Sequence, residues 1–189
     1  YAGKTGYLHD IGKSKIPDSI LKKPGKLTDE EYAEIKNHSL YGHDIINQSL
    51  DDRACALVAL QHHERIQGGG YPYGITGDQM HPLSKIVAVA DVYSAMISSR
   101  VYQKQRDLLN VLKELYKLSF SELDPEYTHC FIRQMLPNFI GKIVTLTDGA
   151  TGKIVMTNPS DYFRPLIQLG EQFIDLSVNP ELKIEKVLI

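Results

Sequence analysis

The sequence of 189 residues has no tryptophan, only two cysteines, a formal net charge of −2 and no long hydrophobic run. Two cysteines make no disulfide framework, and Cys55 lies in an apolar stretch, which favours reduced thiols in a cytoplasmic protein. The small net charge argues against a broad surface for DNA or anionic lipid. The longest apolar run, from Ile86 to Ala90, ends at Asp91 and is far too short to span a membrane. We therefore expect a cytoplasmic globular protein that binds neither DNA nor a membrane through this chain.

Hydrophobic residues at 42% and charged residues at 23% are typical of a globular protein, and the length suits one core-bearing domain with a small appendage. The pattern from Thr28 to Glu31 is a capping box, and apolar residues follow at helical spacing from Tyr32 to Ile46, so His38 is expected on the inward face. The glycines between residues 68 and 73 predict a loop. Further helices are predicted at residues 54–64, 82–99, 107–118 and 125–136.

The composition changes after Pro137. Apolar and polar residues alternate in IVTLTDGATGKIVMTN around Asp148 and Gly149, which predicts a β-hairpin. Short strands are predicted at residues 166–169 and 173–176. The predicted fold is therefore mainly α, with a helical domain over residues 1–136 and a small β-rich module over residues 137–189. The module carries no ligand signature, so we expect it to have a packing role.

Several residues that suit metal binding lie on or next to apolar helical stretches. One inward histidine is more often a hydrogen-bonded core residue than a ligand, but six such residues together favour a shared site. Burying a carboxylate costs several kcal/mol unless a cation compensates it, and a metal ion is the common compensation for histidine with aspartate. The two oxygens of one aspartate can bridge two ions, which is typical of a two-metal hydrolase. The candidate ligands are His9, Asp10, His38, His62, His63 and Asp91.

Four blocks of sequence carry a resemblance to a known family. They are LHDIGKSKIPDSILKKPGKLTDEE, then His38 with Gly42, then HHERIQGGGYP, then IVAVADVYSAMISSRVY. In this order they resemble the signature blocks of the HD-GYP family, metal-dependent phosphohydrolases of the HD superfamily that hydrolyse cyclic di-GMP. The HD pair alone is a weak signal, but HDxGK with HHE and GYP at this separation is specific. The resemblance covers residues 1–136 and implies an HD-type helical bundle.

The resemblance also implies roles for single residues. It implies metal binding at the six candidates above, with Asp10 also catalytic and Lys13 beside the scissile phosphate. From the residues alone, Lys13 lies four positions after His9, so on one helix both side chains would face one cavity; a solvated lysine is the alternative. The glycines of residues 68–70 permit either a close approach of backbone to a bulky ligand or a plain turn. The implied substrate-binding residues are Gly70, Tyr71, Pro72, Arg100 and Lys104, and Tyr71 either stacks on a base or packs.

The sequence also departs from the family pattern. The family usually has aspartate where Gln67 and Ser94 stand, and a basic residue that contacts phosphate where Gln103 stands. Whether Lys104 replaces this phosphate contact stays open. Family members have helices before the HD motif that supply another histidine and, in some, a glutamate for a third ion. Because this chain opens at Tyr1 rather than methionine, we expect sequence upstream of it. The number of ions, two or three, stays open, and the ligand set favours iron or manganese over calcium, with zinc and nickel as alternatives.

The predicted function is that of a metal-dependent phosphodiesterase that hydrolyses cyclic di-GMP to pGpG and, by a second cut, to GMP. One alternative is a non-catalytic module of HD-GYP type that senses the nucleotide or binds a protein, for which a diguanylate cyclase (GGDEF) domain is the expected partner. Another is a general HD phosphohydrolase of mononucleotides, which would leave the GYP segment unexplained. A homodimer is a further expectation.

Overall fold

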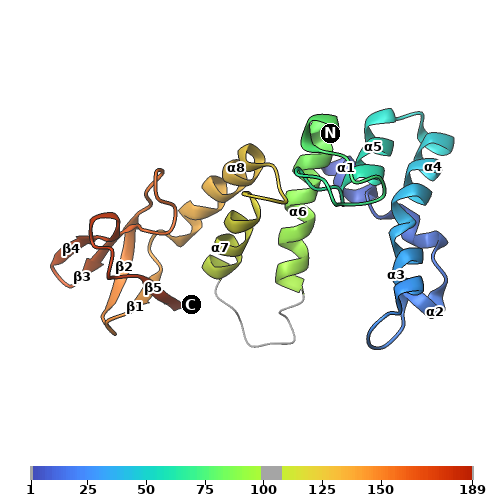
Figure 1. The fold of residues 1–189 in the computed structure, drawn as a ribbon. Helices are drawn as coiled ribbons and strands as arrows, with labels where there is room; N and C mark the ends of the chain where they lie inside the picture. The colour runs from blue at the N-terminus through green and yellow to red at the C-terminus, as the bar shows by residue number, and fades with distance from the viewer. Residues whose placement is uncertain (1, 99–107, 189) are drawn as a thin grey trace. The chain divides into compact units, whose positions relative to one another are not determined.

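The computed structural model describes residues 2–98 and 108–188, which form two compact units. The first unit holds the described residues up to Ser94 together with Leu118–Tyr127, and the second holds the rest. The first is helical, and the second combines helices with a small antiparallel sheet (Figure 1). The predicted mainly α fold with a small β-rich part is therefore confirmed. No helix among residues 2–98 and 108–188 has the length and apolar character needed to cross a membrane.

The helices of the first unit are short and are separated by tight turns. Their bounds are α1 (Ala2–Leu8), the 3-10 helix η1 (Ile11–Lys15), α2 (Asp18–Leu21), α3 (Asp29–Lys36), α4 (His38–Leu50), α5 (Arg53–Gln61), the 3-10 helix η2 (Gly77–Gln79) and α6 (Pro82–Ser98), whose last four residues belong to the second unit.

The start of α3 confirms the predicted capping box. The Glu31 N–H donates to Thr28 Oγ1 at 3.2 Å, and the Thr28 N–H donates to Glu31 Oε2 at 2.8 Å. The apolar spacing from Tyr32 to Ile46 is that of one continuous helix. In the structure it is divided at Asn37, because α3 ends at Lys36 and α4 begins at His38. His38 is buried, as predicted, whereas Tyr32 is 51% exposed and does not lie on the inward face.

Three elements of the first unit approach one another through small residues. A Cβ placed on Gly12 of η1 would lie 1.9 Å from the carbonyl oxygen of His38 and 2.4 Å from the backbone nitrogen of Gly42 in α4. A Cβ on Gly42 would lie 3.2 Å from the Cβ of Ala59 in α5. The neighbouring core contains Ile46, with Cys55 and other residues of α5. The backbone of η1 thus packs directly on α4, and α4 packs closely on α5.

The second unit contains two helices and the sheet. The strand order is β4-β3-β2-β1-β5, and all neighbouring pairs are antiparallel. The bounds are α7 (Leu108–Leu118), α8 (Pro125–Met135), the 3-10 helix η3 (Leu136–Phe139), β1 (Ile143–Leu146), β2 (Thr151–Met156), β3 (Leu166–Leu169), β4 (Gln172–Asp175), the 3-10 helix η4 (Leu176–Val178) and β5 (Ile184–Leu188), with the ends of α7 and α8 at Leu118 and Pro125–Tyr127 in the first unit.

Most predicted elements of the second half are confirmed. The hairpin forms between β1 and β2, and the predicted helices 107–118 and 125–136 correspond to α7 and α8. β5 was not predicted, because its charged residues Glu185 and Lys186 interrupt the apolar pattern. The ring of His129 in α8 stacks on that of Tyr116 in α7, with centroids 5.2 Å apart. The domain boundary at residue 136 stays a prediction.

We expect Gly12→Ala to destabilise the protein strongly. The added methyl group would meet backbone atoms of His38 and Gly42, which cannot rotate away as a side chain can. Overpacking of this kind costs about 2 to 3 kcal/mol. Urea unfolding followed by circular dichroism measures the loss. Gly3→Ala is the matched control, because nothing lies within 4 Å of its Cβ and alanine favours the helix; equal midpoints for the two variants would contradict the prediction.

Candidate metal centre

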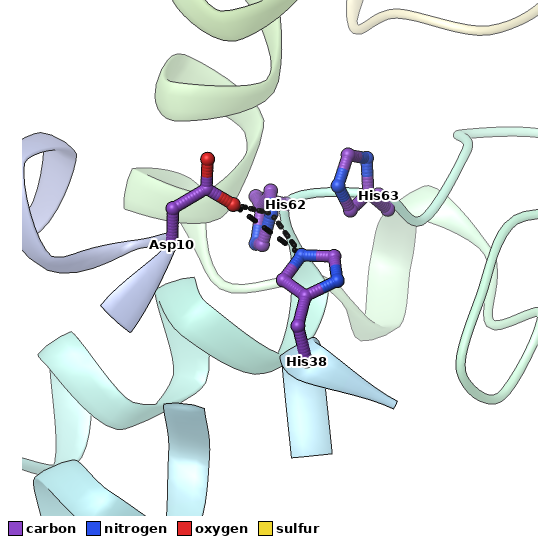
Figure 2. A group of neighbouring side chains, drawn as sticks. All are labelled: Asp10, His38, His62 and His63. Carbon is purple, nitrogen blue, oxygen red and sulfur yellow. Dashed lines mark hydrogen bonds and ion pairs between the residues drawn. The ribbon is translucent and has the colours of Figure 1, made fainter. Parts of the chain in front are cut away.

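All six predicted ligands lie together in the first unit. Ligand atoms of Asp10, His38, His62 and His63 all lie within 4.8 Å of one another (Figure 2). His9 joins the group through its Nε2, which is 3.3 Å from Asp10 Oδ2, and Asp91 joins through an oxygen 3.6 Å from the same nitrogen. His9 and Asp10 lie between α1 and η1, His38 begins α4, His62 and His63 follow α5, and Asp91 lies within α6.

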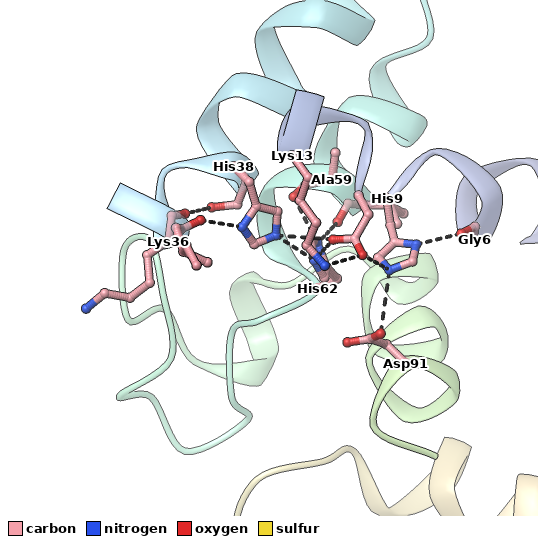
Figure 3. Close-up of polar contacts among 12 residues, drawn as sticks. Gly6, His9, Lys13, Lys36, His38, Ala59, His62 and Asp91 are labelled. Atoms are coloured by element: carbon pink, nitrogen blue, oxygen red, sulfur yellow. Dashed lines mark hydrogen bonds and ion pairs between the residues drawn. The ribbon is translucent and has the colours of Figure 1, made fainter. Parts of the chain in front are cut away.

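Three histidines are oriented by the backbone in the same way. The Nδ1–H of His9 donates to the carbonyl oxygen of Gly6 at 2.6 Å, and that of His38 donates to Ile35 O at 2.6 Å. His62 Nδ1–H donates to Ala59 O at 2.9 Å (Figure 3). A carbonyl oxygen can only accept, so Nδ1 carries the hydrogen in each ring. In the neutral ring, Nε2 therefore directs a lone pair at the cluster, the orientation that metal-ligating histidines need.

This orientation leaves the centre of the cluster short of positive charge. The Nε2 atoms of His38 and His62 lie 3.3 Å apart, and when both rings are neutral their lone pairs oppose each other. Among the buried side-chain atoms of the described residues, His9 Nε2 and Asp10 Oδ1 have no hydrogen-bond partner. Buried polar atoms without a partner are costly, and a bound cation can be ligated by several of them at once. The residues present therefore fit a divalent metal ion.

The two oxygens of Asp10 face different groups. Oδ1 lies 3.4 Å from His38 Nε2 and 3.7 Å from His62 Nε2. Oδ2 lies 3.3 Å from His9 Nε2 and 2.6 Å from Lys13 Nζ. One carboxylate thus lies between two sets of nitrogen atoms, which is the arrangement that a bridging ligand requires.

Burial and charge divide the histidines into two kinds. Burial lowers the pKa of His63 to about 2, and repulsion from His62 adds to this effect. Burial also lowers the pKa of His38. Burial opposes protonation of His9 as well, but the carboxylates of Asp10 and Asp91 near its Nε2 outweigh it and raise its pKa to about 10. Without metal, His38 and His63 are neutral, while a proton on His9 compensates the carboxylates.

Lys13 reaches the cluster by a different route from the predicted one. His9 lies in the turn after α1, whereas Lys13 belongs to the 3-10 helix η1, so the prediction that one helix carries both is wrong. Asp10, the residue before η1, has a non-helical backbone conformation, so α1 does not continue into η1 as one α-helix. The Lys13 ammonium nevertheless lies at the site, since it donates to Asp10 Oδ2 at 2.6 Å.

The GYP segment lies against the histidine pair. The Tyr71 ring stacks on His63 with centroids 4.5 Å apart, and Pro72 follows in the same loop. A Cβ on Gly70 would lie 2.4 Å from Glu64 Cα and 2.5 Å from the His63 carbonyl oxygen. Gly70 is therefore required by packing against the backbone of His63 and Glu64, and the close approach of its own backbone to a ligand stays a prediction.

Glu64 has a role that sequence reasoning missed, although it belongs to the quoted HHE block. Its side chain is 1% exposed, and Oε1 accepts the N–H of Tyr73 at 2.8 Å. Its other oxygen is buried without a partner among the described residues. Glu64 thus ties the far end of the GYP loop to the residues that follow His62 and His63. The signal in the sequence was its position directly after His62 and His63, with three residues between it and the glycine-rich stretch.

Two predicted substrate-binding residues, Arg100 and Lys104, lie outside the described residues, as does Gln103. At one departure from the family pattern, the Gln67 side chain donates to the carbonyl oxygen of Phe120 at 2.9 Å, so it holds a loop contact within the first unit. At the start of α6, His81 Nδ1 accepts the N–H of Leu83.

Comparisons with known proteins agree with this geometry. A family model described as HD domain matches residues 3–127. The chain is 34% identical to a cyclic di-GMP phosphodiesterase of Pseudomonas aeruginosa, over 89% of this chain and 41% of the relative. It is 41% identical to the cyclic di-GMP phosphodiesterase response regulator RpfG of Xanthomonas campestris, over 67% and 34%. It is 35% identical to the 3'3'-cGAMP-specific phosphodiesterase 1 of Vibrio cholerae, over 68% and 30%. The chain spans less than half the length of each of these relatives.

We expect Mn(II) to stabilise the protein and EDTA to reverse the effect. A ligand that binds only the folded state at about 100 times its Kd adds about 2.7 kcal/mol, and for a chain of this size this raises Tm by about 5 to 10 °C. Differential scanning fluorimetry measures the increment with and without metal. His62→Gln should abolish the increment, whereas His43→Gln should keep it, because the hydrogen bonds of His43 in the described part of the chain are with Asp44 and Asn47 of its own helix α4. A full increment in His62→Gln would remove His62 from the ligand set.

Proposed function

Because the chain belongs to the HD domain family, we propose that it acts as a metal-dependent phosphodiesterase that hydrolyses cyclic di-GMP. The observation that carries the proposal is the position of Asp10, whose two oxygens face two separate sets of nitrogen atoms in a cluster where buried polar atoms lack a hydrogen-bond partner among the described residues. The resemblance to the HD-GYP family is confirmed by the family match and by the names of the relatives. Since the chain spans only part of each relative, the activity and the substrate remain proposals for this protein.

The proposed ligand sets follow from the distances. His38, His62 and His63 with Asp10 Oδ1 would hold one ion, and His9 and Asp91 with Asp10 Oδ2 would hold a second. Bound divalent ions would polarise a phosphoryl oxygen and make a water more acidic near neutral pH. Imidazole with carboxylate favours iron or manganese. Whether two or three ions bind stays a prediction.

The chain's own residues supply positioning and charge. Lys13 is held at the cluster by its ion pair with Asp10, so its ammonium can stabilise negative charge that develops on the phosphoryl oxygens. Tyr71 is held by its stack on His63, and the loop that carries Gly70 and Pro72 is held by Glu64. These residues would form one wall of the substrate mouth.

Other predictions made from sequence belong to the same proposal. We propose that the helices of the first unit are arranged as in the HD-type bundle, and that the protein is cytoplasmic. Contacts of Arg100 and Lys104 with substrate, a diguanylate cyclase partner and a homodimer stay predictions. The β-rich part is proposed to have a packing role, because its buried side chains, including Val144, Ile154 and Ile167, form an apolar core within the second unit.

We expect the natural full-length protein, loaded with Mn(II) or Fe(II), to convert cyclic di-GMP to pGpG and then to GMP, and to leave GTP largely unchanged. Chromatography of the products measures the reaction. Asp10→Ala should abolish turnover, because this residue lies between both proposed ion sites, and circular dichroism should show that the helices remain. If the metal-loaded protein binds cyclic di-GMP but releases neither product, the sensor alternative replaces the enzyme.

Lys13→Met should lower kcat by about 100-fold or more and change KM little, because its charge is needed where negative charge develops in the transition state. Steady-state kinetics on cyclic di-GMP separates the two parameters. Lys22→Met serves as the matched control, since Lys22 pairs with Asp18 in an exposed ion pair. An unchanged kcat in Lys13→Met would exclude Lys13 from the chemical step.

A further inference from the structure

Helix α3 has eight residues, yet like the four-residue helix α2 it has no fully buried residue. It is held instead by polar contacts at its start: the capping box between Thr28 and Glu31, and two bonds from Lys23 Nζ to the Glu31 carboxylate at 2.8 and 2.6 Å. At its other end, Asn37 and Tyr41 both donate to the Glu34 carboxylate. A helix fixed in this way contributes little to the core, so its side chains are available for another role.

The end of α3 lies at the metal cluster. The carbonyl oxygen of Ile35 accepts the Nδ1–H of His38, which places the last turn of the helix beside a candidate ligand. Tyr32 precedes Ile35 by one turn and is 51% exposed. Residues three apart on a helix lie on the same side, so the Tyr32 side chain lies within one turn of the carbonyl oxygen that orients His38. At the same cluster, the ring of Tyr71 in the GYP loop stacks on His63 and meets the ring of His38 edge-on, with centroids 6.2 Å apart.

Lys36 adds a positive charge to the same surface. Its ammonium group lies 5.2 Å from the centroid of the Tyr32 ring, within the range of a cation–π contact. Figure 3 shows this side chain beside His38, with the ammonium directed away from the imidazoles. Lys13 pairs with Asp10 and Arg65 pairs with Glu122, whereas no ion pair among the described residues includes Lys36. Its charge is therefore available to an anionic ligand.

We propose that Tyr32 and Lys36 form a second substrate contact beside the metal cluster, in which Tyr32 stacks on one base and Lys36 binds the phosphate that is not being cleaved. This inference rests on the proposed function. A cyclic dinucleotide carries two phosphates and two bases. When one phosphate lies at the metal cluster, the second phosphate and the two bases must be bound by residues around the cluster. An exposed aromatic face next to an unpaired cation is the surface that a base and a phosphate require.

The proposed contact should not distinguish guanine from adenine. Stacking uses the face of a base, and every base has such a face, whereas hydrogen bonds to its edge read its identity. Substitution of Tyr32 should therefore weaken the binding of cyclic di-GMP and of 3'3'-cGAMP by similar factors.

The test measures binding separately from hydrolysis. Isothermal titration calorimetry with a hydrolysis-resistant phosphorothioate analogue of cyclic di-GMP is carried out on the Mn(II)-loaded natural protein. Tyr32→Ala should raise Kd about tenfold and Tyr32→Phe less than about twofold, because the ring and not the hydroxyl makes the contact. Lys36→Gln should raise Kd about fivefold and reduce its dependence on salt concentration. In steady-state kinetics, KM should rise and kcat should change little.

Phe173→Ala and Lys22→Gln are the controls, because Phe173 is an exposed aromatic residue of the second unit and Lys22 pairs with Asp18. Elemental analysis should find the same metal content in every variant. Wild-type affinity in Tyr32→Ala, or a loss of its metal, overturns the proposal. Hydrolysis that proceeds with an unchanged KM in Tyr32→Ala refutes this inference alone. Binding that depends on Tyr32 in a protein without turnover refutes the proposed enzyme and supports the contact.

Discussion

The candidate site depends on the direct contact between the backbone of Gly12 and the carbonyl oxygen of His38. No side chain fits between η1 and α4 at this point, and Gly42 keeps α4 equally close to Ala59. Asp10, His38 and His62 lie within a few residues of these contacts, so the same approach that packs the backbones brings their side chains together. Moving η1 outward by the width of a methyl group would separate Asp10 from both histidines. Packing and chemistry therefore share one constraint.

A close approach of this kind creates an electrostatic problem as well as a site. Backbone carbonyls fix the hydrogens of His38 and His62 on Nδ1, so their Nε2 lone pairs and an oxygen of Asp10 converge where nothing donates to them. Protons on His9 and Lys13 compensate only the other oxygen of Asp10. If stability alone were required, this arrangement would not be expected, because apolar residues at these positions would make the folded state more stable. The loss of stability is explained if a bound cation compensates the cluster.

The sequence predicted which histidines and aspartates lie together, because these residues on apolar stretches are chemically conspicuous and their motif spacing is specific; that they bind metal stays a prediction. It predicted local geometry less well. The division at Asn37 was missed because the apolar spacing from Tyr32 continues across it, and the conformation of Asp10 that starts a 3-10 helix leaves no mark in periodicity. The reason for Gly70 was also missed, since a contact with Glu64 depends on how the loop folds back. Contacts between segments that are far apart in the chain are the hardest to predict from a single sequence.

The distribution of unpaired polar atoms separates structural from functional burial. Gln61 is buried next to His62, yet its oxygen accepts from the His81 N–H and from Ser84, so it stabilises the fold and nothing more is required of it. The three buried side-chain atoms without a partner among the described residues belong instead to His9, Asp10 and Glu64. Buried polar atoms are normally paired, and when the exceptions gather at one place they indicate where the folded chain still needs a ligand. The GYP loop and α3 lie at that place. The loop is held by its bond to Glu64 and by the stack of Tyr71 on His63, and α3 is held by polar contacts at its ends, so both can contact a substrate without disturbing the core.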